Sequence, residues 1–161
     1  MEKLNLGCGK DYKKGWVNVD INKNWKADIF HDLNRTPYPF KDDYFSEILL
    51  KMILEHLENP DKILKEIVRI SKQNAKLIII VPHSMSYTQF TDLQHKNFFT
   101  ENTFSKELLN AYNLNELILI KQIFIYDNKW KKFIPFKKYL KIFFTGIYDD
   151  LLFEFKINKK I

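Results

Sequence analysis

The first residues that could do chemistry form a Gly-X-Gly turn near the start of the chain. Gly7, Cys8 and Gly9 follow a short apolar run at 3–6. Because glycine lacks a Cβ, a strand that ends in this motif lets its backbone approach a ligand closely. Asp20 comes eleven residues after Gly9, where the next strand-like run ends. A carboxylate at that place can accept two hydrogen bonds from ribose hydroxyls. The pattern predicts a site for a nucleotide-like ligand.

The residues around these glycines exclude two common phosphate-binding loops. The dinucleotide fingerprint requires a third glycine where this chain has Tyr12, and an acid about 20 residues further on. The P-loop requires Gly-Lys followed by Ser or Thr, whereas Asp11 follows Gly9-Lys10 here. A third short run instead leads to Asp32, so a second carboxylate is available to the ligand.

Histidines are the candidates for proton transfer, and the chain has four of them: His31, His56, His83 and His95. Imidazole changes its charge near neutral pH and is the side chain most often used as a general base. His56 comes directly after Glu55, just past a predicted strand, and His95 lies in a polar loop. We expect these two to contact the substrate or move a proton. The ordinary alternative for each histidine is a structural hydrogen bond.

A metal site is an alternative that some of these residues could form. Together, His31, Asp32, Glu55 and His56 could supply nitrogen and oxygen ligands. No close ligand spacing on one helix supports such a site, so the sequence predicts no metal centre. The single Cys8 excludes an internal disulfide and any multi-cysteine metal site, and it fits a reducing compartment.

Strand-like and helix-like patterns alternate along the chain and must position these residues. The predicted strands cover residues 3–6, 16–20, 27–30, 45–50, 76–81, 117–126 and 151–157. The run at 76–81 is apolar and rich in β-branched residues, which suits a strand buried on both faces of a parallel sheet. This alternation predicts an α/β fold with a mostly parallel sheet and one late antiparallel strand.

Two helices are expected between these strands. The first begins at Asn59 as N-cap with Pro60 in the first turn, and Asn74 is expected to stop it. Its apolar face repeats at helical spacing. A second helix is expected after Thr100, with these side chains facing inward: Phe104, Leu108, Leu109 and Tyr112. A further helix-like mixture of lysines and aromatics covers 136–148.

Composition places these elements in one globular domain over residues 1–161. The chain has 45% hydrophobic and 29% charged residues, which excludes disordered and fibrous classes. No apolar run is long enough to span a bilayer or to act as a secretory leader, so we expect a soluble cytoplasmic protein.

The net charge of +6 is concentrated near the end of the chain. Residues 121–161 contain 10 lysines and 4 acids, together with many aromatics. A basic aromatic segment can bind nucleic acid or an anionic surface, or its lysines can keep an apolar segment soluble. Because disordered tails are poor in aromatics, we expect this segment to fold as two final strands with a helix between them.

Taken in order, these segments resemble the class I S-adenosylmethionine (SAM)-dependent methyltransferases of the small type 11 kind. The resembling pieces are L-N-L-G-C-G-K at 4–10, G-W-V-N-V-D at 15–20, A-D-I-F-H-D-L at 27–33, Y-P-F at 38–40, L-E-H-L at 54–57, V-P-H at 81–83 and H-K-N-F-F-T at 95–100. The resemblance covers about residues 3–110. It implies a Rossmann-like, mostly parallel seven-stranded sheet with an antiparallel last strand. Few residues separate the first two strands, so the first crossover helix is expected to be shortened or absent.

The resemblance also implies which residues hold the cofactor: Gly7, Cys8, Gly9, Asp20, Asp32, Leu33, Lys51 and Met52. Asp20 would bind the ribose hydroxyls, and Asp32 the adenine amino group, with Leu33 packing nearby. The glycine turn would act through its backbone, so Cys8 is not expected to be a nucleophile. Backbone carbonyls of Lys51 and Met52 would face the cofactor's amino group.

The methyl acceptor is the part of the function on which the sequence leaves alternatives open. The leading interpretation is SAM-dependent methylation of a small molecule or sugar-like metabolite. A second is methylation of RNA or protein that uses the basic segment at 121–161. A third is a non-catalytic binding module on the same fold. A homodimer is compatible with all three, because fold and cofactor site do not fix the partner.

Overall fold

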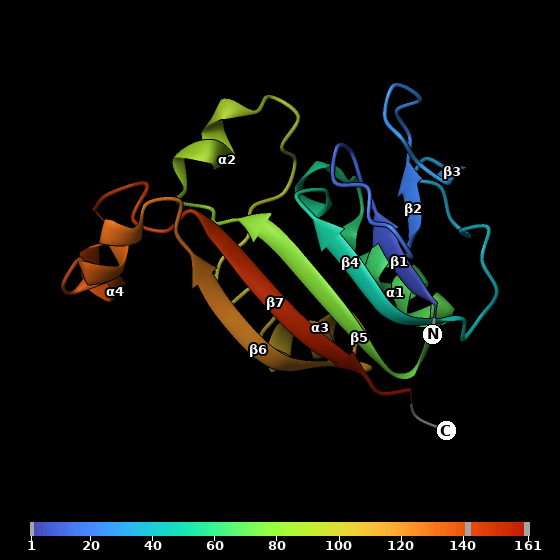
Figure 1. Cartoon of the computed structure of the whole chain (residues 1–161). Helices are drawn as coiled ribbons and strands as arrows, with labels where there is room; N and C mark the ends of the chain where they lie inside the picture. Colours follow the sequence, from blue (N-terminus) through green and yellow to red (C-terminus); the bar gives the residue numbers. More distant parts are fainter. Residues whose placement is uncertain (1, 141–142, 160–161) are drawn as a thin grey trace.

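A seven-stranded sheet forms the centre of the protein, with strand order β3-β2-β1-β4-β5-β7-β6 (Figure 1). A computed structural model describes residues 2–140 and 143–159. The strands are β1 (Lys3–Leu6), β2 (Val17–Asp20), β3 (Ile29–Phe30), β4 (Phe45–Lys51), β5 (Ser71–Pro82), β6 (Leu117–Ile125) and β7 (Asp150–Ile157). Strands β1 to β5 pair in parallel, and β7 runs antiparallel to both β5 and β6. The predicted Rossmann-like sheet with an antiparallel last strand is confirmed.

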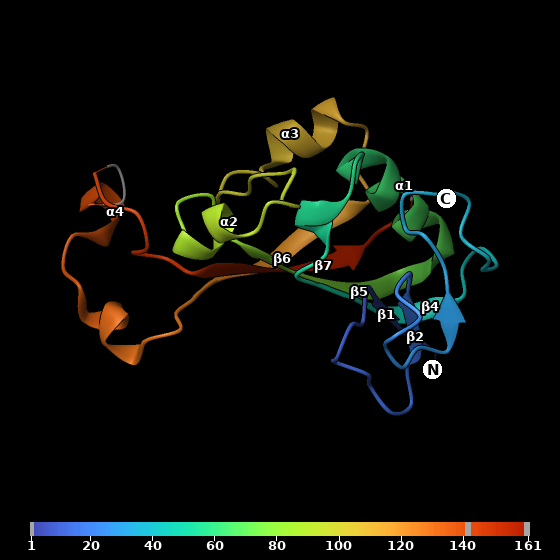
Figure 2. The same ribbon diagram turned by 90° about the horizontal axis from the view of Figure 1, so that it is seen from above.

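The helices are short apart from one. They are η1 (Leu54–His56), α1 (Pro60–Ile70), α2 (Tyr87–Thr91), α3 (Lys106–Ala111), η2 (Lys129–Phe133) and α4 (Lys137–Leu140). Seen from above, α1 and α3 lie on the same side of the sheet (Figure 2). The connection between β1 and β2, residues 7–16, contains no helix. The expected loss of the first crossover helix is therefore confirmed.

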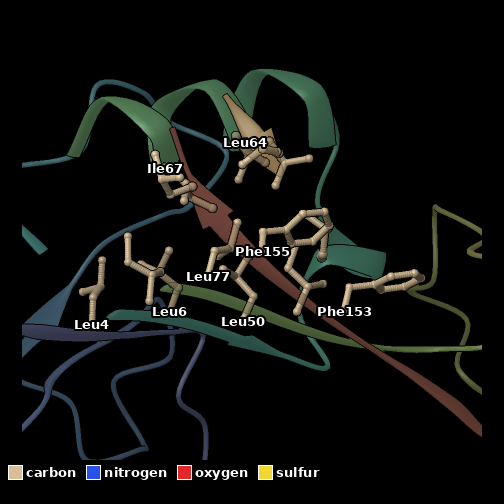
Figure 3. Packing of buried hydrophobic residues seen from close by; sticks show 14 of the residues in the cluster. Leu4, Leu6, Leu50, Leu64, Ile67, Leu77, Phe153 and Phe155 are labelled. Carbon is tan, nitrogen blue, oxygen red and sulfur yellow. The ribbon is translucent and has the colours of Figure 1, made fainter. Parts of the chain in front are cut away.

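The core lies between α1 and the sheet. The helix turns four side chains inward, each at most 2% exposed: Ile63, Leu64, Ile67 and Ile70. They pack over apolar side chains of β1, β4, β5 and β7 (Figure 3). Burying one such side chain contributes about 1.5–3 kcal/mol, so this face of α1 fixes the helix on the sheet.

The end of α1 differs from the prediction, which placed the stop at Asn74. The helix ends at Ile70, and the Ser71 hydroxyl donates to the Ile67 carbonyl over 2.7 Å. Ser71 already pairs with Phe45 in the sheet, and this strand pairing takes the chain away from the helix. Asn74 does adopt a left-handed conformation (φ 63°), but it does so inside β5.

The inward face predicted for the second helix is only half correct. Phe104 and Leu109 are buried, whereas Leu108 and Tyr112 are 41% and 53% exposed. Phe104 precedes the helix, which begins after Ser105, whose hydroxyl accepts a hydrogen bond from the Leu108 amide. The helix therefore starts later than the apolar spacing predicts. Leu108 and Tyr112 lie on its exposed side instead of facing the core. The short α2 was not predicted.

The segment at 121–161 is folded over the residues that the structure describes. In β7, Phe153 and Phe155 are buried, while Glu154 and Lys156 face the other side of the sheet, as predicted. The helix expected over 136–148 is much shorter, since α4 has four residues; positions 141–142 lie outside the described residues.

Residues 126–140 and 143–146 belong to an arm that projects beyond the end of the sheet (Figures 1 and 2). It carries large exposed aromatics: Trp130, Phe133, Phe136, Tyr139, Phe143 and Phe144. Several contacts hold the base of the arm on the body, among them an ion pair between Lys131 Nζ and Asp149 Oδ1 at 2.6 Å. The Gly146 amide donates to the Met85 carbonyl over 2.6 Å, and the Tyr148 ring stacks on Phe124 at 4.2 Å. Across the described parts of the chain, no helix has the length and apolar character needed to cross a membrane.

Candidate active site

A cavity of about 350 Å³ opens at the carboxyl ends of β1, β2 and β4. Its walls are formed by Gly7, Gly9, Asp20, Ile21, His31, Asp32, Leu33, Asn34, Met52, Ile53, His56, Leu57 and Gln94. The volume falls within the range of small-molecule sites, and open α/β sheets bind their ligands at this edge. Most of the residues predicted to hold a cofactor therefore share one cavity.

The two glycines of the turn have different physical roles. Gly7 (φ 66°) lies against a wall of the protein, since a Cβ added there would come within 2.8 Å of Ile53 Cβ. Gly9 (φ 47°) faces open space, and an added Cβ would meet no protein atom within 4 Å. Gly7 is thus needed for packing, whereas Gly9 leaves room above its backbone for a ligand.

Asp20 is the buried carboxylate of the cavity, and the backbone holds it in place. Its Oδ2 accepts a hydrogen bond from the Gly9 amide at 2.7 Å, and its Oδ1 accepts one from the Asn22 amide at 2.8 Å. A carboxylate has about four acceptor positions, so each oxygen can accept one more hydrogen bond. The glycine turn and the end of β2 are therefore joined at one preorganised acceptor.

Asp32 and Leu33 form the wall beyond β3. The Asp32 carboxylate accepts a hydrogen bond from the Asn34 amide at 3.0 Å and lies 3.4 Å from the Arg35 guanidinium. The Leu33 side chain is buried, and its carbonyl accepts a hydrogen bond from the Tyr38 hydroxyl at 2.9 Å. These bonds hold the Asp32 carboxylate beside the apolar Leu33 side chain. Such a pair can bind a planar ring that has a polar edge.

Cys8 and Lys51 do not line the cavity. The Cys8 amide donates to the Val19 carbonyl over 3.0 Å, and burial raises the pKa of its thiol. A buried thiol of raised pKa is a poor nucleophile, which agrees with the expectation from the sequence. Lys51 extends away and pairs with Asp11, Nζ to Oδ2, at 3.3 Å.

Met52 turns the chain from β4 into η1 and so brings His56 to the cavity. Its backbone is left-handed (φ 53°), which is unusual for a side chain of this size, and its amide donates to the Ile80 carbonyl over 2.8 Å. Neighbouring Ile53 fills the space under Gly7. The backbone strain is thus held by the sheet at the point where the site requires a sharp turn.

His56 and His95 meet although 38 residues lie between them in the sequence. Their ring centroids are 4.7 Å apart, and His56 lines the cavity while the His95 side chain is 7% exposed. The loop that carries His95 is attached to η1, because the amides of Lys96 and Asn97 both donate to the Glu55 carbonyl, at 2.8 and 3.1 Å. The two predicted catalytic histidines thus form one cluster.

Glu55 lies behind these rings and is completely buried. Burial raises the pKa of its carboxyl to about 7. Burial and the neighbouring His95 lower the pKa of His56. The cluster therefore combines a neutral imidazole with an acid that titrates near neutral pH.

The other two histidines have structural roles. The buried His83 accepts a hydrogen bond from the Met85 amide at Nδ1 and pairs with Glu101 at 3.3 Å. His31 lines the cavity, and its Nε2 lies 2.8 Å from the Arg35 carbonyl.

Sequence reasoning missed several wall residues that come from loops: Ile21, Asn34, Ile53, Leu57 and Gln94. Their positions follow from the path of each loop, which leaves no periodic signal. A larger hollow of about 820 Å³ lies between α3 and β6, but no predicted site residue lines it.

Comparison with known proteins finds a family model that matches a little under half of the chain. The family model of a type 11 methyltransferase domain matches residues 4–79. An uncharacterized protein of Methanocaldococcus jannaschii is 44% identical over 76 residues, which cover 47% of this chain and 36% of that protein. A second uncharacterized protein of the same organism is 35% identical over 95 residues, covering 48% of this chain and 39% of that protein. The matches thus span well under two thirds of either curated relative.

Solved structures share the fold over nearly the whole chain. A SAM-dependent methyltransferase from Archaeoglobus fulgidus superposes with a TM-score of 0.73 at 17% identity, covering 96% of this chain and 85% of that chain. A methyltransferase solved in complex with the Trm112 methyltransferase activator of Haloferax volcanii gives a TM-score of 0.67 at 17% identity, covering 98% and 83%. At these identities the structures establish the fold alone.

Proposed function

Since residues 4–79 match the model of a type 11 methyltransferase domain and the chain has a Rossmann-like fold, we propose that this protein binds SAM in the cavity and methylates a small-molecule acceptor. The observation that carries the proposal is the hydrogen bond from the Gly9 amide to the Asp20 carboxylate. The turn leaves open space above its backbone, and the carboxylate that it holds still has acceptor positions for a ribose.

The residues present fit the cofactor in three respects. Asp20 offers a buried acceptor at the end of β2, and Asp32 offers a second carboxylate beside the apolar Leu33. Gly9 leaves the space between the turn and the acids free of a side chain. Cys8 and Lys51 would contribute through backbone groups only. Bound SAM would supply an electrophilic methyl group to a nucleophilic acceptor, with the S–CH3 bond broken and S-adenosylhomocysteine and a proton released.

The acceptor is proposed to enter beside His56, which lines the cavity and contacts His95. The His56 imidazole, with Asn34 and Gln94 in the same wall, presents hydrogen-bonding groups beside apolar side chains. Such a surface suits a hydroxylated small molecule or sugar-like metabolite. His56 and His95 would orient the acceptor or receive its proton.

A second candidate function, methylation of RNA or protein, is favoured only by the arm at 126–140 and 143–146. Its lysines and exposed aromatics resemble surfaces that bind phosphate backbones and bases. Two of these lysines are already engaged within the protein. Lys131 Nζ pairs with Asp149 at 2.6 Å, and Lys137 Nζ donates to the Lys132 carbonyl at 2.7 Å. An RNA affinity that falls steeply with salt would support this candidate over the small-molecule acceptor.

Replacing Asp20 by Ala is expected to weaken binding of S-adenosylhomocysteine (SAH) about tenfold to a hundredfold. The change removes the acceptor for the ribose and leaves buried donors unpaired, at a cost of about 1–3 kcal/mol. Isothermal titration calorimetry of both proteins measures the difference. Asp20→Asn is the matched control, because it keeps the shape and one acceptor oxygen and should give a smaller loss. An unchanged affinity in folded Asp20→Ala protein would exclude the ribose assignment.

Substitutions at the two glycines are expected to separate folding from binding. Gly9→Ala meets no protein atom and costs about 1–2 kcal/mol of stability for its left-handed backbone, but its methyl group enters the ligand space. We expect a folded protein with at least tenfold weaker SAH affinity. Gly7→Ala collides with Ile53 and should lower the unfolding temperature much more. If Gly9→Ala binds SAH as well as the wild type does, the cofactor does not lie against this turn.

A further inference from the structure

We propose that Glu55, His56 and His95 form a site for a divalent metal ion of the zinc class, directly beside the cofactor cavity. Each residue offers one ligand atom, and these three atoms lie within 4.8 Å of one another. Within the described residues, no such group includes His31 or Asp32, which were weighed as ligands with Glu55 and His56. A metal site is a property separate from methyl transfer, and binding of the ion can be measured without a methyl acceptor.

The spacing of the cluster is close to that of a bound ion. Nitrogen and oxygen ligands lie about 2.0–2.2 Å from zinc, so two ligand atoms of a tetrahedral site are about 3.4 Å apart. Glu55 Oε1 and His56 Nε2 are 4.0 Å apart. Small side-chain movements therefore bring the three atoms onto one ion. The partly exposed His56 ring, at 25%, has room to make such a movement.

Buried polar atoms without partners point to the same ligand. Both carboxylate oxygens of Glu55 are buried without a hydrogen-bond partner among the described residues. Leaving such groups unpaired destabilises the fold, so buried polar groups are nearly always satisfied. A completely buried carboxylate that faces two imidazoles is satisfied by a cation.

His95 is oriented as metal-ligating histidines are. Its Nδ1 lies 3.1 Å from the Gln89 carbonyl oxygen, and a carbonyl can only accept, so Nδ1 carries the proton. The lone pair of this ring is then on Nε2. In most histidine ligands of metals, the nitrogen that does not bind the ion donates a hydrogen bond in this way, which fixes the tautomer of the ring.

The surrounding charges favour a cation. Asp92 Oδ2 lies 4.0 Å from His95 Nε2, and the negative charges of Asp92 and Asp150 add to the raised pKa of Glu55. A divalent ion relieves the repulsion among these carboxylates. Two imidazoles and one carboxylate are a ligand set that suits zinc, iron or nickel rather than magnesium or calcium.

Three protein ligands leave an open position on the ion, as in catalytic metal sites. His56 belongs both to this cluster and to the wall of the cavity, so the open position lies at the proposed acceptor side. An ion there would hold a hydroxyl oxygen of the acceptor and lower its pKa. This role of the ion rests on the proposed function, whereas the binding of the ion does not.

Titration of the chelator-treated full chain with Zn²⁺ tests the site. Calorimetry is expected to show one equivalent bound with micromolar or tighter affinity. Co²⁺ in place of Zn²⁺ is expected to give visible absorption bands of a four- or five-coordinate site. Glu55→Gln and His95→Ala should each weaken Zn²⁺ binding at least a hundredfold, since even outer hydrogen-bonding partners contribute about tenfold to a hundredfold. His31→Ala is the matched control and should bind Zn²⁺ as the wild type does.

Two further measurements make the test decisive. Thermal unfolding in chelator is expected to show Glu55→Gln at least as stable as the wild type, because an unpaired buried acid is removed. Added Zn²⁺ should raise the unfolding temperature of the wild type but not of Glu55→Gln. Absence of stoichiometric binding, or equal affinity in folded Glu55→Gln protein, would overturn the proposal. A separate SAH titration reports the cofactor site independently.

Discussion

A chain that ends at Asp127 is expected to be insoluble or unfolded. The truncation removes β7, which lies between β5 and β6 and pairs with both. Four of the lost side chains are at most 1% exposed: Leu151, Phe153, Phe155 and Ile157. At about 1.5–3 kcal/mol each, their burial is comparable to the 5–15 kcal/mol of an entire domain. Expression yield and circular dichroism of the truncated chain measure the loss.

A linker variant is the matched control for this truncation. Replacing residues 133–144 by a Gly-Ser linker of the same length removes most exposed aromatics of the arm but keeps β7. It also keeps Lys131 paired with the buried Asp149. We expect this variant to fold with nearly the stability of the full chain. A truncated protein as soluble, monomeric and stable as the full chain would mean that residues 128–161 are an appendage.

Replacing His56 or His95 by Ala is expected to lower methyl transfer about 10²–10⁴-fold while SAH affinity changes little. Both rings belong to one cluster at the proposed acceptor side, so either change removes a group that orients or deprotonates the acceptor, directly or through a bound ion. Turnover is measured with labelled SAM and an acceptor identified by a methyl-transfer screen.

Lys65→Ala, on the outer face of α1, controls for nonspecific effects on turnover. Lys65 is about half exposed and forms only a weak surface ion pair with Asp61. A loss below tenfold at both histidines, in folded protein, would assign them a structural role. A large loss at His56 alone would separate the residue on the cavity wall from the one behind it.

The part of the cavity that is proposed to hold the cofactor could be predicted from the sequence because its residues are close in the chain. The glycine turn, Asp20 and Asp32 follow successive strands, and parallel pairing brings the ends of these strands to one edge. Local residue types are sufficient for that step. The same reasoning predicted β7 from its alternation of buried and exposed residues.

The acceptor side depends on contacts that leave no local signal. His95 reaches His56 because two backbone amides of its loop bond to the Glu55 carbonyl. The sequence therefore suggested both histidines as candidates and grouped Glu55 with His56, but it gave no reason to bring His95 to these two residues. The two errors in the predicted helices have a similar origin. Strand pairing at Ser71 ends α1 at Ile70, earlier than predicted, and the late start of α3 leaves Tyr112 exposed.

Calorimetric titration of the full chain with SAH, with NAD⁺ in parallel, tests the central claim most directly. The Gly9–Asp20 arrangement predicts one equivalent of SAH bound, and no comparable binding of NAD⁺, because the third glycine of the dinucleotide loop is replaced by Tyr12. Absence of SAH binding, or equal binding of NAD⁺, would contradict the assignment of this cavity to SAM.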